Sequence, residues 1–276
     1  MFELDETFGR DKPLLVAVVG VGGTGSEMVS ALANLHLGLL ARGNAGIHVV
    51  AFDPDCVSES NIVRQRYAPS DIGYPKATVL INRVNLTYGF DWEAVVDRFR
   101  SKHADTTWDL LISSVDTRLA RNEIHRYLFR ERFSACRFWL DVGNDRTTGQ
   151  VILGTPRRAR CGTRQQPGLP CATELHPELM DVSVKEDAPS CSAAESLARQ
   201  DLMVNKMVVT LAVDLLWRFL TERRIATHAR YFDLEQSALS ARRVPGRGAT
   251  ARPGATRAST PKTKAALRRR PRSSRV

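Results

Sequence analysis

The sequence predicts an α/β fold: a Rossmann-like, doubly wound and mostly parallel sheet with added C-terminal strands and a long crossover segment. Residues 14–20 (LLVAVVG) and 46–52 (GIHVVAF) are apolar runs rich in β-branched side chains, as buried parallel strands are. Residues 25–40, between them, have apolar side chains at helical spacing. This strand–helix–strand order indicates a parallel sheet with helices on its faces.

The same patterns predict further elements after residue 52. We expect weak helices at 60–67 and 75–87, a strand at 109–115, a helix at 117–132, strands at 137–143 and 148–154, a helix at 192–220 and a final strand at 229–234. The strands at 137–143 and 148–154 are close enough in sequence to form a hairpin. Residues 156–189 contain five Pro and two Cys and break the pattern, so we expect a crossover segment that is functional or mobile.

The net charge of +10 is concentrated at the end of the chain. Residues 242–276 contain 12 Lys and Arg and no acidic residue, whereas residues 1–241 contain 28 Lys and Arg against 30 Asp and Glu. The tail has almost no large apolar side chain, so burial cannot offset the entropy of ordering it. We expect a folded domain over 1–241 and a disordered basic tail over 242–276. The tail either contacts nucleic acid or another polyanion non-specifically, or is a dispensable extension.

The sequence lacks the signals of a membrane or exported protein. It has no run of 18 apolar residues, and its first residues include Glu3, Asp5 and Glu6 in place of a basic region. Its five cysteines are an odd number without the spacing of a small disulfide-rich domain. We therefore expect a cytoplasmic protein with reduced thiols and no membrane partner.

A glycine-rich loop joins the first strand to the first helix. It places Gly20, Gly22, Gly23 and Gly25 where a backbone can approach a phosphate chain, next to the N–H groups and positive dipole end of a helix. Asp53 ends the second strand, where an acidic residue hydrogen-bonds ribose hydroxyls in dinucleotide-binding folds. These features alone fit an NAD or FAD enzyme as well as an ATP enzyme.

The residues after the second strand favour phosphate transfer chemistry. The run 53–65 (DPDCVSESNIVRQ) brings an amide and Arg64 close to Asp53, and Lys76 follows shortly after. Arg can clamp phosphate oxygens with two donors and Lys supplies a point charge, which suits the charge that develops during adenylation. Asp116 follows a later strand and should reach the same crevice, where a carboxylate suits Mg²⁺ carried by a triphosphate.

These motifs, GVGGTGS, DPDCVSESNIVRQ, the lysine of GYPKA and SSVD, resemble the ThiF/MoeB/E1-like superfamily, which activates ubiquitin-like proteins. The resemblance covers about residues 14–155 and continues more weakly to 220. Within the superfamily, Pro189–Ser192 and Arg199–Leu202 look like the ThiF-family protein of the PRTRC system, a bacterial gene cluster. The resemblance implies that residues 1–241 form an adenylation domain. It also implies ATP as the nucleotide and a C-terminal glycine carboxylate as the nucleophile.

The resemblance also assigns roles to individual residues. Gly20 would form the tight turn, Gly22 and Gly25 would line the phosphates beside Gly23, and Asp53 would hold the ribose. Phosphate contacts would come from Asn61, Arg64 and Lys76 with Gln65 beside them, and Asp116 would hold Mg²⁺. The implied partners are a small ubiquitin-like or sulfur-carrier-like protein and a second copy of the chain. Many members take an arginine from that second copy, for which Arg10 is the candidate.

The cysteines depart from the family pattern. Many relatives hold a structural zinc with two CxxC pairs, but this sequence has none. The spacing of Cys161, Cys171, His176 and Cys191 matches no standard zinc module, so we expect no zinc. Cys191 follows Ser190, a good N-cap, and a thiol at a helix N-terminus is more nucleophilic. Cys191 is therefore a candidate acceptor of the acyl group, and its alternative is a buried structural role.

Structural roles remain open for the other candidates. Gly22 and Gly23 could serve helix–strand packing alone, Arg64 and Lys76 could be surface cations, and Asp116 could cap the helix at 117–132. Two other functions compete with adenylation of a carrier protein: a non-catalytic E1-like binding partner, and an NAD- or FAD-dependent oxidoreductase. Chemistry on a small molecule or a tRNA base is a further outcome within the same superfamily.

Overall fold

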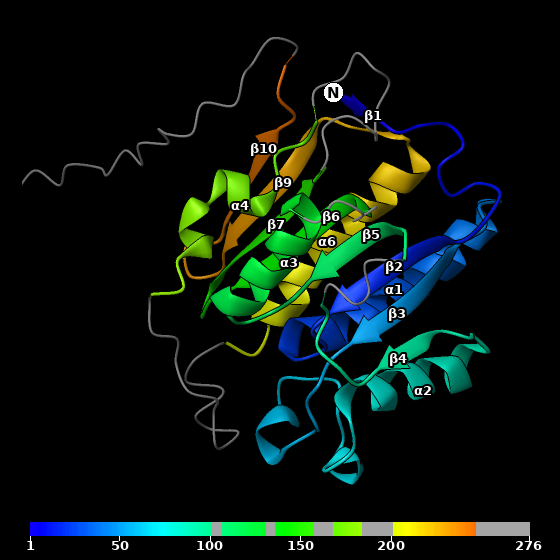
Figure 1. Ribbon diagram of the computed structural model, residues 1–276, viewed down its shortest axis with the longest axis vertical. Coiled ribbons are helices and arrows are strands. Elements are labelled where there is room, and N and C mark those ends of the chain that lie inside the picture. The colour runs from blue at the N-terminus through cyan, green and yellow to red at the C-terminus, as the bar shows by residue number, and fades with distance from the viewer. Residues whose placement is uncertain (101–105, 131–135, 157–167, 184–200, 247–276) are drawn as a thin grey trace, which may run out of the picture.

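The computed structural model describes residues 1–100, 106–130, 136–156, 168–183 and 201–246. An eight-stranded sheet with the order β10-β9-β7-β6-β5-β2-β3-β4 runs through the molecule (Figure 1). Its parallel part consists of β4 (Glu93–Val95), β3 (Ile47–Phe52), β2 (Leu14–Val19), β5 (Trp108–Ser113) and β6 (Cys136–Asn144). The predicted α/β fold with a mostly parallel sheet is thus confirmed.

Helices cover both faces of the sheet. One face carries α1 (Gly23–Ala41), α2 (Lys76–Tyr88) and α6 (Val204–Thr221), and the other carries α3 (Arg118–Arg130) and the short α4 (Ala172–Leu175) (Figure 1). Alternation along β2 shows the two faces directly, because Val16 and Val18 join the core under α1, whereas Ala17 and Val19 join the core under α3. Both faces are buried, which explains why the parallel strands are apolar at every position.

The sheet ends in an antiparallel part. β6 turns into β7 (Thr148–Gly154), which confirms the predicted hairpin, and β7 pairs with β9 (Thr227–Asp233). β10 (Ala238–Arg243), which the sequence interpretation missed, forms the outer edge. A separate two-stranded sheet joins β1 (Phe2–Glu3) to β8 (Arg224–Ile225), so the first residues of the chain pair with the segment that follows α6.

Two predicted helices differ from the structure. Residues 60–67 form only the short 3₁₀ turn η1 (Glu59–Asn61) followed by turns, because side chains from elsewhere take their backbone groups. The helix expected at 192–220 is not continuous: residues 201–203 are not helical, and α6 begins at Val204. Its first part lies outside the described residues.

The basic tail and the crossover segment have more regular structure than the sequence predicts. β10 includes Arg242 and Arg243, which the sequence interpretation placed in the basic tail, and Val244 is buried. Within the expected crossover segment, the structure describes α4 and the 3₁₀ turn η4 (Pro177–Met180). The Thr155 N–H donates to the Leu169 carbonyl, and the Leu169 N–H donates to the Thr155 hydroxyl. The chain therefore returns at Leu169 to the place where it left the end of β7. Among the helices described, none is long and apolar enough to cross a membrane.

Candidate functional site

The candidate site lies where β2, β3 and β5 end, which we call the carboxyl edge. Gly20 leaves β2 with a φ of +85°, a conformation that favours glycine. Its N–H donates to the Phe52 carbonyl at 2.9 Å, and its own carbonyl accepts the Ser114 hydroxyl at 2.7 Å. The turn after β2 is therefore tied to the ends of both neighbouring strands, as the predicted tight turn at Gly20 requires.

The three other glycines of the loop have different surroundings. A Cβ at Gly22 would meet nothing within 4 Å, so this position faces open space. A Cβ at Gly23 would lie 2.7 Å from the amide nitrogen of Asn205, and one at Gly25 would lie 1.9 Å from the Gly20 carbonyl oxygen. Gly22 is thus open to a ligand. Gly23 and Gly25 have packing roles that stand beside the phosphate contacts predicted for them.

Asp53 connects the glycine loop to the segment after β3. The carboxylate is 5% exposed and accepts the Val21 N–H at 2.7 Å and the Asp55 N–H at 2.9 Å. Burial raises the pKa of this carboxyl, and the two backbone N–H donors act in the opposite direction. Each oxygen keeps a second lone pair, so hydrogen bonding to a hydroxyl remains available.

Lys76 begins α2 as a buried cation. Its side chain is 10% exposed, and its Nζ lies 3.2 Å from the carboxylate of the more exposed Asp55. The Lys76 N–H also donates to the Asp55 carbonyl at 2.9 Å. The positive charge of Lys76 also lies close enough to Asp53 to stabilise its ionised form. An enclosed cation beside two carboxylates is not an ordinary surface lysine, so the structure favours the site role over the surface role.

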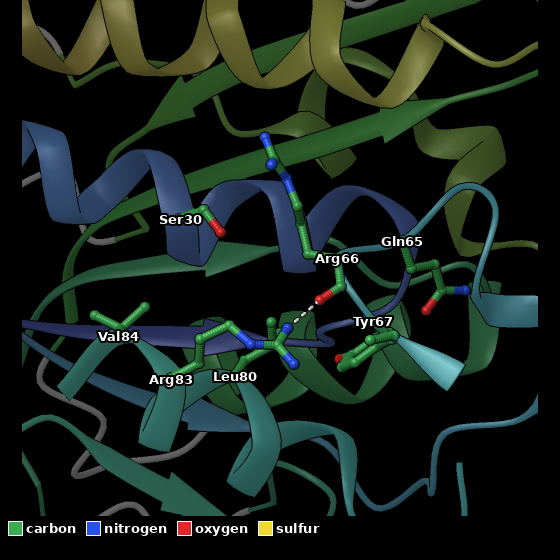
Figure 2. A pocket seen from close by; sticks show the side chains of 8 residues that line it. Ser30, Gln65, Arg66, Tyr67, Leu80, Arg83 and Val84 are labelled. Carbon is green, nitrogen blue, oxygen red and sulfur yellow. Dashed lines mark hydrogen bonds between the residues drawn. The ribbon is translucent and has the colours of Figure 1, made fainter. Parts of the chain in front are cut away.

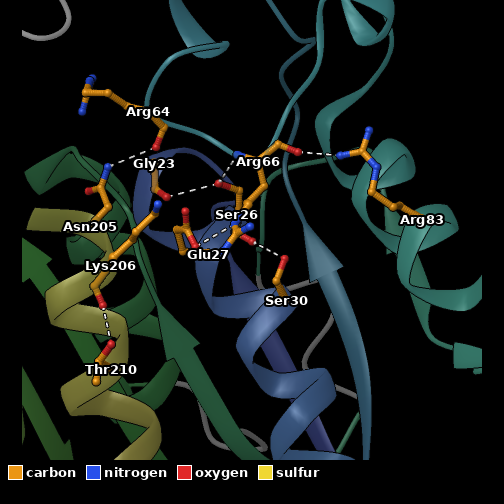
Figure 3. Close-up of polar contacts among 10 residues, drawn as sticks. All are labelled: Gly23, Ser26, Glu27, Ser30, Arg64, Arg66, Arg83, Asn205, Lys206 and Thr210. Carbon is orange, nitrogen blue, oxygen red and sulfur yellow. Dashed lines mark hydrogen bonds and ion pairs between the residues drawn. The ribbon is translucent and has the colours of Figure 1, made fainter. Parts of the chain in front are cut away.

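Residues 61–68, here the Arg64 segment, include one helix-like hydrogen bond, from the Gln65 N–H to the Asn61 carbonyl at 3.1 Å, and are held mainly by side chains. Asn61 accepts the Ser58 N–H through its side-chain oxygen at 2.9 Å. The Arg66 N–H donates to the Ser26 hydroxyl at 3.1 Å, and its guanidinium pairs with Glu27 at 2.8 Å (Figure 3). The Tyr67 hydroxyl donates to the Val21 carbonyl at 2.6 Å. The Arg64 segment is therefore fastened to the glycine loop and to α1.

Arg64 itself is half-buried, and burial lowers the pKa of its guanidinium without removing the charge. Its carbonyl accepts the side-chain amide of Asn205, and its side chain points away from Ser26 and Glu27 (Figure 3). The Gln65 side-chain oxygen is inaccessible to solvent and has no hydrogen-bond partner in the described structure. Arg64 and Gln65 follow Asn61 by three and four positions.

A surface hollow of about 390 Å³ lies behind the Arg64 segment (Figure 2). Ser30, Gln65 and Tyr67 contribute to its wall, together with residues of α2. Both of its guanidinium groups have partners, because Arg66 pairs with Glu27 and Arg83 pairs with Asp71 at 2.7 Å. Arg83 of α2 also donates to the Arg66 carbonyl, and this hydrogen bond holds the Arg64 segment against α2 (Figure 2).

Asp116 follows β5 and is exposed. It does not supply the cap of α3, because the Thr117 hydroxyl accepts the Ala120 N–H at 3.2 Å. The turn that carries Asp116 is anchored through the two residues that precede it. Ser114 bonds to Gly20 as described above, and the buried Arg121 donates to the Val115 carbonyl at 3.2 Å. The Asp116 side chain is thus presented to solvent at the same edge as the glycine loop.

Sequence reasoning missed the residues that hold the site together. Arg121 forms a buried ion pair with Asp141 at 3.0 Å, and Asp141 also accepts the Ser113 hydroxyl at 2.7 Å. Asn205 is 1% exposed. One signal could have found it: Asn205 precedes the buried Val208, Val209 and Ala212 by three, four and seven positions, which places a polar residue on an apolar helix face. No comparable local signal marks Arg121.

The cysteine candidates are only partly described. Cys191 and Cys161 lie outside the described residues. Cys171 is fully buried in the core under α3, and His176 contacts Tyr231 and Glu178. Within the described ranges, no three His, Cys, Asp or Glu side chains gather closely enough to hold a metal ion by themselves. Arg10 is exposed in the turn before β2, and its role in the site of a second copy stays a prediction.

The arrangement fits a nucleoside triphosphate with a phosphate-bound Mg²⁺. The open position at Gly22 lies at the N-terminus of α1, where unpaired N–H groups favour an anion. Mg²⁺ in nucleotide sites needs only one or two protein carboxylates besides phosphate oxygens and water, so the single exposed Asp116 suffices. Lys76 and Arg64, which both follow β3 in the chain, supply positive charge.

Comparisons with known proteins give a family and a shared fold. The model of the ThiF family matches residues 12–251. The ubiquitin-like modifier-activating enzyme 5 of Caenorhabditis elegans is 25% identical over 171 residues, which are 56% of this chain and 38% of the nematode protein.

Solved structures show the same fold. MccB of E. coli in a crystal structure with ATP has a TM-score of 0.57 at 14% identity, over 88% of this chain and 67% of MccB. PaaA has a TM-score of 0.55 at 14% identity, over 84% of this chain and 64% of PaaA. The chain therefore spans about two fifths of the nematode relative and just under two thirds of PaaA. At these identities the structures show a shared fold, a mainly parallel sheet with antiparallel C-terminal strands.

Proposed function

Because the chain belongs to the ThiF family, we propose that it is an ATP-dependent adenylyltransferase. Its substrate would be the C-terminal carboxylate of a small ubiquitin-like or sulfur-carrier-like protein. One observation carries the proposal: hydrogen bonds tie the segments bearing Asp53, Arg64 and Asp116 to a glycine loop that remains open at Gly22.

In this reaction a carboxylate oxygen attacks the α-phosphorus of ATP, the bond from that phosphorus to the bridging oxygen breaks, and pyrophosphate leaves. The products are an acyl-adenylate and pyrophosphate, so atoms and charge balance. Negative charge grows on the departing pyrophosphate, and fixed cations that face it lower the barrier. Lys76 and Arg64 would supply those cations, and Mg²⁺ held by Asp116 would neutralise phosphate charge.

The remaining site residues would bind and orient the nucleotide. Gly22, with Gly20, Gly23 and Gly25 shaping the loop, would let phosphates approach the first N–H groups of α1. Asp53 would accept a ribose hydroxyl through a lone pair not used by the Val21 and Asp55 N–H groups. Asn61 and Gln65 would contact phosphates from the Arg64 segment.

The relatives support a protein or peptide substrate. The nematode relative is by name a ubiquitin-like modifier-activating enzyme, and MccB of E. coli has been crystallised with MccA and AMPCPP. Since this chain spans only part of their length, the substrate stays a proposal. The relationship to the PRTRC protein, the homodimer with Arg10 completing the partner's site, the cytoplasmic location and a later acyl transfer to Cys191 also remain predictions.

The proposal is tested by ATP–pyrophosphate exchange, with small proteins and peptides encoded beside the gene as substrates. We expect exchange that depends on one of them. Asp116→Asn and Arg64→Ala should each lower its rate by about 100-fold or more, since each removes charge from the reacting phosphates. Asp91→Asn and Arg42→Ala are matched controls, because both residues are exposed and lie away from the carboxyl edge, Asp91 just before β4 and Arg42 at the C-cap of α1.

Three outcomes would contradict the proposed reaction or the residue roles in it. Exchange that survives in Asp116→Asn and Arg64→Ala would remove these residues from the mechanism. Tight ATP binding without exchange for any tested substrate would favour the non-catalytic E1-like partner. Tight NAD or FAD binding without ATP binding would favour the oxidoreductase, in which the buried Lys76–Asp55 pair has no evident use.

A further inference from the structure

Asn205 lies in the first turn of α6 and contacts both parts of the candidate site. Its side chain is 1% exposed. Its oxygen accepts the Thr24 hydroxyl at 3.1 Å, and its nitrogen donates to the Arg64 carbonyl at 3.5 Å (Figure 3). Thr24 belongs to the first turn of α1 and Arg64 to the segment after β3, so one amide bridges two segments that are far apart in sequence.

The polar contact continues into the sheet. The Thr24 hydroxyl has a single proton, which it shares between the Asn205 oxygen and the side-chain oxygen of Asn144, 2.6 Å away at the end of β6. α1 and α6 pack closely along one face of the sheet, which leaves the buried amide of Asn205 little freedom to turn away. A displacement of Asn205 would therefore shift the positions of the glycine loop and of Arg64 together.

Asn205 also explains why residue 23 is a glycine. A Cβ at Gly23 would lie 2.7 Å from the amide nitrogen of Asn205 and 3.2 Å from its amide carbon. Real Cβ contacts do not reach 2.7 Å, so any side chain at position 23 must displace the amide. The missing side chain at Gly23 thus makes room for the Asn205 amide, whereas the missing side chain at Gly22 leaves space that no protein atom fills.

We propose that Asn205 is a positioning residue that sets the placement of Arg64 relative to the glycine loop. Its oxygen acts on the loop through Thr24, and its nitrogen acts on Arg64 through the main-chain carbonyl. The inference rests on the proposed function for the role of Arg64, but the placement itself can be measured without any reaction.

Asn205→Ala and Thr24→Val separate the two contacts. Asn205→Ala removes both, and we expect kcat for exchange to fall about ten-fold and KM for ATP to rise several-fold, since misplacement by a fraction of an ångström weakens catalysis. Thr24→Val removes the hydroxyl that contacts Asn205 and Asn144 but keeps the Asn205 contact with Arg64, so it should raise KM for ATP and change kcat little. Thr210→Ala is the matched control, because Thr210 is exposed on the same helix and bonds only to the Lys206 carbonyl (Figure 3).

Hydrogen exchange provides a readout that needs no substrate. In Asn205→Ala the amides of residues 62–66 should exchange about ten-fold faster, while those of β3 should not change. If Asn205→Ala does not fold, Asn205→Ser carries the same test, since its side chain is polar but too short to reach Arg64. Equal exchange at 62–66 in the Asn205 and Thr210 variants would overturn the proposal, whatever the activity measurements show.

The contact with Gly23 gives a second independent readout. In the native background, Gly23→Ala should lower Tm because the new methyl group meets the Asn205 amide. In the Asn205→Ala background the same change should raise Tm, because alanine is favoured over glycine in a helix. The same direction of change in both backgrounds would show that the amide does not occupy this space. Failure of pyrophosphate exchange alone would instead count against the proposed function.

Discussion

The parallel and antiparallel parts of the sheet use their polar residues differently. In the parallel part, polar groups gather at the carboxyl edge and join loops that are far apart in sequence, such as Tyr67 with Val21 and Ser114 with Gly20. In the antiparallel part, hairpins connect β6 to β7 and β9 to β10, and β7 pairs with β9 to make the ladder continuous. There His228 is buried inside the sheet, and every residue of β10 is exposed.

This difference follows from how the strands are connected. Crossover connections bring the ends of parallel strands to one edge, so their loops must satisfy each other's backbone groups and leave a few positions open. Hairpins satisfy the backbone within the ladder itself. We therefore expect changes at the carboxyl edge to affect nucleotide chemistry and stability together, and changes in the antiparallel part to affect stability alone.

The largest expected effect is the loss of the buried ion pair beneath the Asp116 turn. Arg121 and Asp141 are 7% and 0% exposed, so Arg121→Met leaves a buried carboxylate without its partner. We expect the free energy of unfolding to fall by about 3–5 kcal/mol in urea titrations. The Arg121→Met, Asp141→Leu double variant should recover most of that loss, because no buried charge remains.

The antiparallel part contains the matched control. Arg230 of β9 pairs with Asp214 of α6 at 2.7 Å, but the Asp214 side chain is 41% exposed. Water stabilises Asp214 when its partner is removed, so Arg230→Met should change stability by only about 1 kcal/mol or less. Equal losses for Arg121→Met and Arg230→Met would show that burial does not distinguish the two regions.

A smaller effect is expected within the glycine loop. Gly25→Ala places a methyl group against the Gly20 carbonyl, which must move, and overpacking of this kind costs about 1–3 kcal/mol. Gly22→Ala meets no atom within 4 Å and should leave urea stability nearly unchanged while weakening ATP binding. The expectation fails if the two variants lose stability equally, or if Gly22→Ala binds ATP like the native protein.

The smallest effect concerns the pH dependence set by His228. Its Nδ1 lies 3.0 Å from the Leu153 carbonyl, and burial lowers the pKa of the imidazole below its usual value. The folded protein therefore keeps His228 neutral, while the unfolded chain takes up a proton below about pH 6.5. The contribution of neutral His228 to the free energy of unfolding is complete above that pH. It decreases as the pH falls through 6.5 towards the lower pKa of His228 in the folded protein.

Urea titrations of the native protein and His228→Gln at pH 7 and pH 5.5 test this sign. The native protein should lose about 1 kcal/mol more than the variant over this interval. Pyrophosphate exchange in His228→Gln should match the native rate at pH 7, because His228 lies away from the carboxyl edge. An identical pH dependence of stability in both proteins would mean that His228 does not titrate differently on folding.

Much of the carboxyl edge was predictable because its signals are local. The apolar runs before Gly20 and Asp53 predict buried parallel strands, and those strands predict where the two residues emerge. The run that begins at Asp53, with Lys76 after it, and Asp116 could be expected at one edge, because Asp53 and Asp116 follow predicted parallel strands and the carboxyl ends of such strands face one crevice. The helix expected at 60–67 was wrong, because local composition did not reveal that Ser26, Glu27, Arg83 and Asn205 take over its backbone and side-chain contacts.

The sequence by itself therefore determined the type of sheet, the position of the glycine loop and the residue types that meet beside it. Only the tertiary structure decided which glycine is open, that Thr117 rather than Asp116 caps α3, and that Asn205 and Arg121 hold the site. Hydrophobic periodicity is a property of a short window and can be read directly. Contacts such as Arg64 with Asn205 join residues 141 positions apart, and they exist only once the strands have paired and α6 has packed against α1.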